Sequence, residues 1–295
     1  MQIHDARRLP DGHYLLALGE AGVIRINANG KQLVHFALPA FHLVLTINGE
    51  RALALARRGD VVRASRIDLT TCMVSDWLSH PIDFWAPQYD GVVWNAVIDN
   101  RIVAIDTSKD QLSVIWQVAQ LPGKVIDFLD DGVTQLILMA KAQELEQWRY
   151  ALPSRRMGQR DAIALPDMGV TQVCARTGYG GPFILTFSHG ANGCSLLVTR
   201  DVGHSLSVDL GSVIGEPTAQ VQNEWLLVHA LLADGRYRCQ VIDAQLAGVV
   251  AELYVLRPNE ARVRAHDGHI LVFDRSGRLL DVECTTRALR TLSLS

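Results

Sequence analysis

Residues 261–294 read ARVRAHDGHILVFDRSGRLLDVECTTRALRTLSL, and this stretch decides the fold of the chain. Turn residues at Asp267-Gly268 and Ser276-Gly277 separate short segments in which apolar and polar side chains partly alternate. Alternation with a period of two is typical of strands with one buried face, and Asp-Gly pairs suit tight hairpins. The stretch therefore predicts a meander of four antiparallel strands.

The central apolar segment of this meander recurs along the whole 295-residue chain. The seven copies begin at residues 13, 51, 91, 134, 182, 224 and 269, and read HYLLAL, RALALA, GVVWNAV, TQLILMA, PFILTF, EWLLVHAL and HILVFD. Each copy is followed by a turn and a second segment with partial alternation. Repeats of about 40 residues built from short strands are typical of β-propeller blades.

We therefore predict an all-β chain forming a single β-propeller domain over residues 1–295, with seven four-stranded blades. Six blades plus an irregular segment at 141–170 is the alternative, because that region is the least regular. Residues 141–150 (KAQELEQWRY) are rich in helix formers, but their place in the repeat favours a hairpin. If residues 2–8 and 288–294 are the first and last strands, each blade is contiguous and the ring closes by side-chain packing.

Composition bounds the function. Hydrophobic residues make up 48% of the chain and charged residues 20%, which is typical of a globular protein. The net charge is -3, so the chain lacks the basic excess of nucleic-acid-binding proteins. Apolar runs of four to eight residues predict no membrane insertion. A polar start, with no signal-like segment, and five dispersed cysteines without a CxxC pair indicate a reduced, cytoplasmic protein.

A basic and aromatic segment, QWRYALPSRRMGQRD, is the first candidate binding site. Its four arginines could hold carboxylates or phosphates, and two aromatic rings could stack on the guanidinium groups. The alternative is an ordinary solvated edge neutralised by nearby acidic residues. The candidate residues are Arg149, Arg155, Arg156, Arg160, Trp148 and Tyr150.

The segment HPIDFWAPQYDGVVWN is the second candidate, because exposed aromatic residues often anchor interfaces. Trp85 and Tyr89 are its candidate binding residues, within a group that includes Trp77, Phe84 and Trp94. The alternative is that these rings pack between neighbouring blades.

Catalytic, metal and cofactor motifs are weak. The chain contains no GxSxG, HExxH, GxxxxGK[ST] or strand-linked GxGxxG pattern, so we predict no cofactor, no metal and no catalytic residues. The segment AIDTSKDQLSVIW looks like the tryptophan-docking repeat of quinoprotein dehydrogenases, but it lacks the Thr-Gly pair and occurs once. His266 and His269 flank Asp267, which a turn explains better than a metal site.

The phrases QYDGVVWN, WRYALPSRR, NEWLLVHALLADGRYRCQVID and DRSGRLLDVE resemble the β-propeller component of bacterial MoxR–vWA–β-propeller ternary systems. This resemblance implies a non-enzymatic interaction scaffold. Its implied partners are a MoxR-type AAA+ ATPase and a von Willebrand A-domain (vWA) protein.

Two function classes therefore compete. The first is a protein-interaction scaffold that binds through its loops. The second is a hydrolase or lyase in the central tunnel of the propeller, with acid and base groups near strand starts. For that enzyme the candidate residues are Asp11, His13, Asp83, Asp267 and His269.

Overall fold

The computed structural model divides the chain into two compact units, which we describe one at a time. Unit 1 comprises Met1–Ile163 with Ser293–Ser295, and unit 2 comprises Ala164–Leu292. The structure describes residues 2–45, 50–59, 61–81, 84–85, 93–98, 101–106, 114–117, 124–130, 134–141, 144–151, 156–163, 172–176, 183–190, 193–201, 204–215, 217–222, 225–243, 248–257, 260–266, 268–283, 286 and 288–293.

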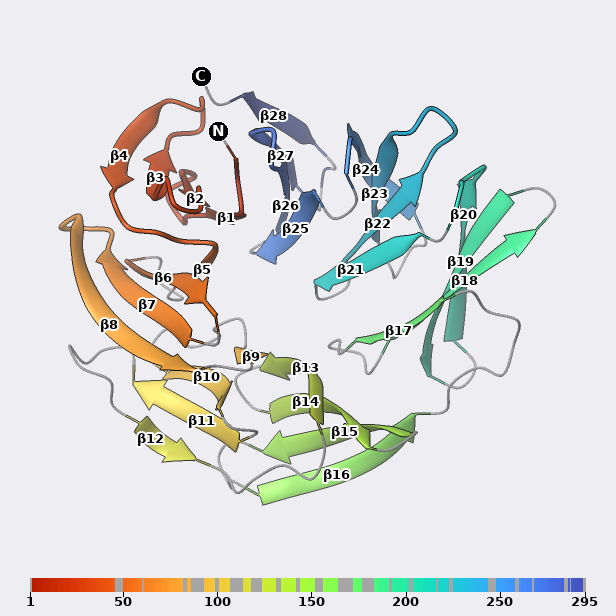
Figure 1. Ribbon diagram of the computed structural model, residues 1–295, viewed down its shortest axis with the longest axis horizontal. Coiled ribbons are helices and arrows are strands. Elements are labelled where there is room, and N and C mark those ends of the chain that lie inside the picture. The colour runs from red at the N-terminus through yellow and green to blue at the C-terminus, as the bar shows by residue number, and fades with distance from the viewer. Residues whose placement is uncertain are drawn as a thin grey trace. The chain divides into compact units, whose positions relative to one another are not determined.

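The described strands of unit 1 form four sheets, each made of four consecutive strands (Figure 1). The sheets are β1 (Asp5–Arg8), β2 (Tyr14–Ala17), β3 (Val23–Ile26) and β4 (Gln32–Phe36); β5 (His42–Leu45), β6 (Arg51–Arg58), β7 (Val61–Asp68) and β8 (Met73–Pro81); β9 (Phe84–Trp85), β10 (Val93–Ile98), β11 (Arg101–Asp106) and β12 (Val114–Gln117); and β13 (Lys124–Asp130), β14 (Thr134–Lys141), β15 (Glu144–Ala151) and β16 (Arg156–Ile163).

The described strands of unit 2 form three sheets with the same meander topology. They are β17 (Gln172–Arg176), β18 (Phe183–Gly190), β19 (Gly193–Asp201) and β20 (His204–Gly211); β21 (Thr218–Gln222), β22 (Trp225–Leu231), β23 (Tyr237–Asp243) and β24 (Gly248–Val255); and β25 (Ala261–His266), β26 (His269–Asp274), β27 (Arg278–Glu283) and β28 (Leu289–Ser293).

The repeat pattern of the sequence is confirmed strand by strand. Each of the seven apolar segments overlaps the second strand of a sheet, from β2 to β26, and the segment after it overlaps the third strand. Residues 144–151 form β15, which pairs with β14 as an antiparallel hairpin, so the helix formers there do not make a helix. The first and last sheets are each contiguous, as predicted. The number of blades in a closed ring stays a prediction.

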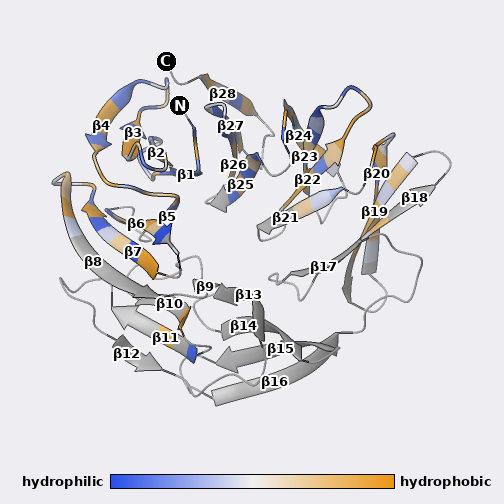
Figure 2. Cartoon of the chain, viewed as in Figure 1, coloured by the Kyte–Doolittle hydropathy of each residue, from blue (hydrophilic) through white to orange (hydrophobic). Residues whose placement is uncertain are grey.

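The second strands whose side chains are described are mostly buried on both faces. Every residue of β2 is buried, as are five consecutive residues of β22, so these strands must pack between neighbouring sheets. Third and fourth strands show more alternation, and Figure 2 shows hydrophobic and hydrophilic residues alternating along β4 and β7. Apolar clusters consequently join adjacent sheets within each unit, such as Leu15 and Val23 with Leu43 and Ile67 in unit 1.

Carboxylate and amide side chains close several hairpin turns. Asp274 is almost fully buried, and its Oδ1 accepts hydrogen bonds from the Ser276 backbone N–H (2.8 Å) and hydroxyl (2.6 Å) and from the Arg278 N–H (3.1 Å). Asn27 closes the β3–β4 turn in the same way, through the N–H groups of Asn29 and Lys31. These side chains replace the backbone acceptors that a tight turn lacks, which explains the polar residues between apolar segments.

Arginines connect one sheet to the next through backbone carbonyls. In unit 1, Arg25 of β3 donates to the Leu69 carbonyl oxygen (3.2 Å). In unit 2, Arg238 of β23 donates to Leu210 of β20, and Arg278 of β27 donates to Tyr254 of β24. A guanidinium group carries five N–H donors, so it can satisfy edge carbonyls that no strand covers. Sheet-to-sheet contact thus combines apolar packing with a polar link.

Within the described residues, no helix has the length and apolar character that crossing a membrane would require.

We predict that Gly19→Ala destabilises unit 1 by about 2–4 kcal/mol, more than Gly12→Ala does. Both glycines have positive φ (66° and 79°), so both substitutions carry backbone strain. A Cβ at Gly19 would also lie 2.8 Å from His4 Nε2 and 3.2 Å from Phe41 Cε1, whereas at Gly12 the nearest atom is 3.9 Å away. Urea denaturation followed by tryptophan fluorescence measures the difference, and equal losses would contradict this packing.

Buried His229 makes unit 2 sensitive to acid. Its side chain is 1% exposed, and burial, aided by the positive charge of Arg262, lowers its pKa to about 4, although the Ala261 backbone opposes the shift. The unfolded histidine titrates near its ordinary value of about 6.5. Stability from neutral His229 is therefore fully present above pH 6.5 and is lost as the pH falls toward 4, by about 3 kcal/mol.

We expect His229→Gln to flatten this dependence, because glutamine does not titrate. The measurement is the urea midpoint of the wild type and the variant at pH 7.5 and pH 4.5. The variant should lose less stability than the wild type over that interval, and parallel losses would show that other groups control the acid response.

Candidate binding sites

A buried carboxylate joins the first strands of two neighbouring sheets in unit 1. Asp5 of β1 is fully buried; its Oδ1 accepts a hydrogen bond from the Ala6 N–H and its Oδ2 one from the Leu43 N–H of β5, both at 2.9 Å. Arg7 Nε donates to the Leu43 carbonyl oxygen (2.8 Å), and an Arg7 terminal nitrogen lies 3.6 Å from Asp5 Oδ2. This arrangement fixes the position of β5 beside β1.

Two histidines and an aromatic ring surround this junction. His42 Nδ1 lies 4.0 Å from Asp5 Oδ2, which is too long for a hydrogen bond, although a protonated ring would be attracted to the carboxylate at that distance. The His42 side chain is 41% exposed. The His4 and Phe41 rings meet edge to face, with 4.9 Å between their centroids. Phe41 is thereby held in place at the start of β5, and His42 is presented toward solvent.

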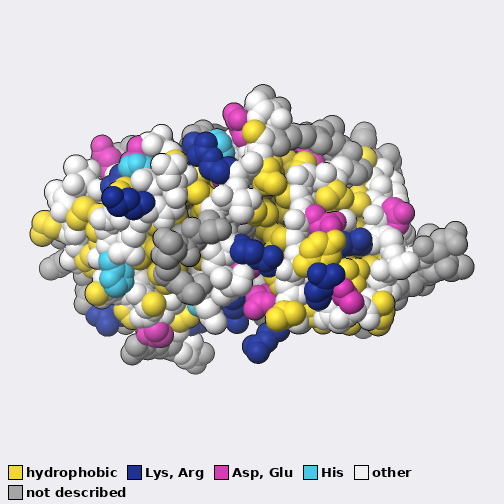
Figure 3. Space-filling model, turned by 90° about the horizontal axis from the view of Figure 1, so that it is seen from above, with side chains coloured by type: hydrophobic (Ala, Val, Ile, Leu, Met, Phe, Trp, Pro, Cys, Tyr) yellow, Lys and Arg dark blue, Asp and Glu magenta, His cyan; other side chains and the backbone are white. Residues whose placement is uncertain are grey.

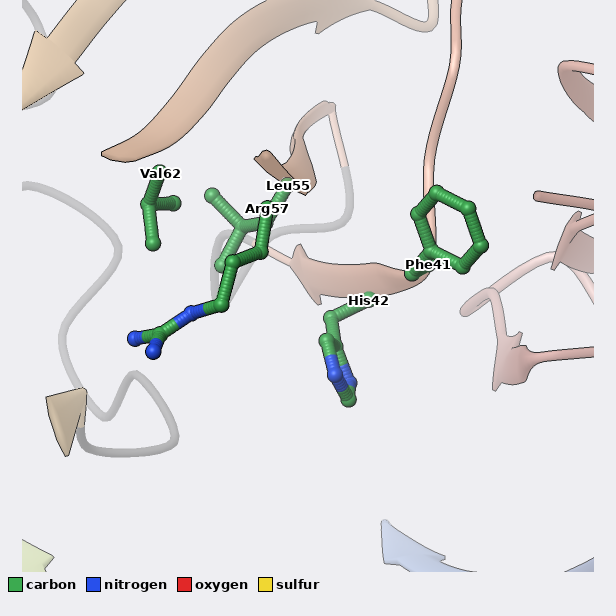
Figure 4. Close-up of a pocket in the computed structure, with 5 residues that line it drawn as sticks. All are labelled: Phe41, His42, Leu55, Arg57 and Val62. Carbon is green, nitrogen blue, oxygen red and sulfur yellow. The ribbon is translucent and has the colours of Figure 1, made fainter. Parts of the chain in front are cut away.

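A pocket of about 270 Å³ opens beside His42 (Figure 4). Phe41 directly precedes β5 and His42 is the first residue of β5, whereas Leu55 and Arg57 come from β6 and Val62 from β7. Leu55 and Arg57 are two residues apart and so share a face of β6, and Arg57 is paired in register with Val62. Figure 4 shows the Arg57 and His42 side chains extending to the same side of the pocket. The pocket therefore combines apolar walls with two basic groups.

A second candidate surface lies on β24, the fourth strand of its sheet in unit 2. From Val250 onward its residues alternate between inward and outward positions, and the outward positions carry Glu252 and Tyr254. Val249 is 42% exposed and Leu256, just past the strand, is 76% exposed. We call Val249, Tyr254 and Leu256, together with Arg236, the β24 surface.

Polar contacts hold the tyrosine of this surface in one position. Tyr254 donates its hydroxyl hydrogen to Glu252 Oε1 (2.6 Å), and this hydrogen bond is the main reason that the pKa of Tyr254 is raised. The Arg236 guanidinium lies over the ring, 4.9 Å from its centroid, and is itself paired with Asp234 (2.6 Å). Figure 3 shows hydrophobic side chains standing among Lys, Arg, Asp and Glu on one face of the molecule. Fixed aromatic and arginine side chains are typical of interface anchors.

The described acid–base candidates make contacts in different units. Asp11 and His13 belong to unit 1, where Asp11 contacts His13 Nδ1 (3.1 Å) and Arg25 (2.5 Å). Partial burial is the largest single influence and raises the pKa of Asp11, but hydrogen bonds from the His13 backbone and Arg25 bring it below its usual value. His269 belongs to unit 2 and pairs with Asp281 (2.7 Å). Asp83 and Asp267 lie outside the described residues.

Metal-ligating groups do not gather in the described part of the chain: no cluster of three or more His, Cys, Asp or Glu side chains that could hold a metal ion is found there.

The arginine candidates lie in strands rather than in a shared loop. Trp148, Arg149 and Tyr150 belong to β15, and Arg156 and Arg160 belong to β16. The register pairs Trp148 with Arg160, and it shifts between Trp148 and Tyr150. Trp148, Arg149 and Tyr150 thus lie in the hairpin that their place in the repeat predicts, and their strand also pairs with β16. Arg155 lies outside the described residues. Binding by this group stays a prediction.

The second aromatic candidate is only partly described. Trp85 lies in the two-residue strand β9, where the register pairs it with Ala96 of β10. Tyr89 lies outside the described residues. The proposed aromatic platform therefore stays a prediction.

Sequence reasoning missed Asp5, His42 and Arg57. Asp5 is a charged residue in a short first strand, and nothing in its neighbourhood signals that the N–H of Leu43 reaches it. His42 and Arg57 are 15 residues apart, and only the β5–β6 and β6–β7 pairings bring them to one pocket. β1 reads DARR, so a carboxylate among other charged residues offered no signal that would single out Asp5.

No protein-family model and no curated protein matches this chain. Among solved structures, it is similar to hydrazine synthase of Kuenenia stuttgartiensis (TM-score 0.55, 11% identity, 99% of this chain and 95% of that one). It is also similar to apo AztD from Citrobacter koseri (TM-score 0.56, 13% identity, 95% and 94%) and to KlHsv2 with loop 6CD replaced by a Gly-Ser linker (TM-score 0.57, 9% identity, 100% and 99%). These similarities and the four-stranded meanders show that the chain has an all-β, β-propeller fold.

We predict that Asp5→Ala destabilises the protein by about 3 kcal/mol, because two buried backbone N–H groups lose their acceptor and Arg7 loses its nearby carboxylate. The matched control is Asp11→Ala, whose side chain is 44% exposed and whose loss should cost at most about 1 kcal/mol. Urea denaturation at pH 7 measures both. Equal effects of the two substitutions would show that Asp5 does not tie β1 to β5.

Proposed function

We propose that this propeller is a non-enzymatic scaffold that binds other proteins, and that the β24 surface is one of its contact sites. The observation that carries the proposal is the set of exposed apolar side chains on a fourth strand, with Arg236 stacked on Tyr254. Tyrosine and arginine are enriched among residues that dominate binding energy, and they contribute most when their conformation is already fixed.

The proposal also names the proteins that this chain binds. The resemblance to MoxR–vWA–β-propeller systems suggests a MoxR-type AAA+ ATPase and a vWA-domain protein, acting together with this chain in the cytoplasm. Free thiols at Cys72, Cys194 and Cys239 accord with a reducing compartment. Either partner would bury Leu256, which is now 76% exposed.

An enzyme remains the second candidate function, on one observation. The Asp5 carboxylate and the His42 ring lie beside a pocket, and a histidine oriented by a carboxylate is a common general base. The 4.0 Å separation and the two backbone hydrogen bonds that Asp5 already accepts favour a structural role instead. The enzyme function would be supported if the His42→Gln variant lost catalytic turnover and the Arg57→Gln variant retained it.

The test of the scaffold is quantitative affinity capture from the native lysate, with four tagged versions of the full chain as bait. The first is the wild type, and the second carries Tyr254→Ser and Leu256→Ser. The third is a matched control in unit 1, Leu33→Ser and Met73→Ser, which also removes two exposed apolar side chains from fourth strands. The fourth carries Arg155→Ala and Arg156→Ala and tests the predicted arginine site.

We expect the wild type and the unit 1 control to recover an AAA+ ATPase or a vWA-domain protein, and the Tyr254/Leu256 variant to recover at least about tenfold less. If only the arginine variant failed to recover the partner protein, the contact would lie at residues 155–156 and not at β24. Failure of the wild type to recover either protein at low salt would overturn the partnership with the two protein classes.

A further inference from the structure

We propose that the pocket formed by Phe41, His42, Leu55, Arg57 and Val62 binds a small organic acid, with one carboxylate attached to a compact apolar body. This site lies in unit 1, away from the residues of the β24 surface in the sequence and in a different sheet. It does not depend on the proposed scaffold function, since a purified chain can bind such a ligand without any protein partner.

The basic groups define the charge of the ligand. Arg57 is exposed at the pocket, and its guanidinium can form two parallel hydrogen bonds to a carboxylate. Because a guanidinium group has five N–H donors, Arg57 can donate hydrogen bonds to a ligand as well as to a neighbouring group of the protein. His42 is half exposed beside it, and Figure 4 shows the two side chains extending to the same side. Both side chains line the pocket, so both contribute to its preference for an anion.

The buried Asp5 does not cancel this preference for an anion. Its two oxygens accept the N–H groups of Ala6 and Leu43, and Arg7 lies 3.6 Å from the carboxylate. Asp5 is fully buried, whereas Arg57 is exposed, so a ligand approaching from solvent meets the basic groups first. The charge of Asp5 is thus offset by Arg7 within the protein.

The walls and the volume define the body of the ligand. Leu55 and Val62 are almost fully buried and form the floor of the pocket, so the apolar surface that a ligand can reach comes from the half-buried Phe41 ring and the aliphatic part of the exposed Arg57 side chain. The volume of about 270 Å³ is below the range of roughly 300–1,000 Å³ that is typical of sites for drug-sized ligands. A short branched or phenyl-bearing acid satisfies both features, and a phosphate or a sugar would leave the apolar walls without contacts.

The rigidity of the strands supports binding with little reorganisation. Arg57 and Val62 are paired in the β6–β7 register, and the position of β5 is fixed by Asp5. Preorganised walls reduce the entropy lost when a ligand binds.

The test uses isothermal titration calorimetry of the purified full chain with two probes, 4-methylpentanoate and phenylacetate. Each probe has a matched neutral control, 4-methylpentanamide and phenylacetamide, and inorganic phosphate serves as an anion without an apolar body. We expect saturable binding of at least one acid, with at least about tenfold weaker binding of its amide and of phosphate.

The variants are Arg57→Gln and a matched control, Arg63→Gln, which removes the same charge from an exposed position of β7 that does not line the pocket. Arg57→Gln should weaken binding about tenfold, and Arg63→Gln should leave it unchanged. Circular dichroism and urea midpoints would show that both variants are folded. Three results would each overturn the proposal. They are the absence of saturable binding of either acid at millimolar concentration, equal binding of an acid and its amide, and equal effects of the two substitutions.

Discussion

The burial of the second strand, seen in β2, β22 and β26, is the constraint on which the rest of the structure depends. A strand such as β2, buried at all four residues, has no face left for solvent, so the sheet must be covered on both sides. Within each unit the cover is the neighbouring sheet, as the shared clusters of Leu15 with Leu43 and of Leu227 with Val272 show. Burial at about 25 cal/mol per Å² makes this stacking the main stabilising term.

The same stacking positions the two candidate sites. First strands meet one another across sheets, as β1 and β5 do through Asp5, and the pocket opens beside that junction. Fourth strands have one edge without a partner strand in their own sheet, and β24 there exposes Tyr254 and Leu256. The inner strands carry most of the core, although the pocket is also lined by Leu55 and Arg57 of β6 and by Val62 of β7.

Polar groups between sheets make the stacking specific. Apolar packing alone would tolerate a small slip of one sheet against the next, but Asp5 accepts the N–H of one particular residue of β5, and Arg25 donates to one particular carbonyl. A slip would leave these buried groups without partners, at a cost of about 1–3 kcal/mol each. Similar arginine links recur in unit 2 at Arg238 and Arg278.

The sequence by itself determined the strands, their grouping and their turns, because periodicity and turn chemistry are local: HILVFD predicts β26, and DRSG predicts its turn at Asp274. Tertiary structure alone decided the pocket and the Asp5 junction, because these depend on register and on stacking between residues far apart in the chain. Arg57 reaches the pocket only because β6 pairs with both β5 and β7. It also decided that Arg156 and Arg160 lie in β16, where the backbone groups are satisfied by pairing with β15.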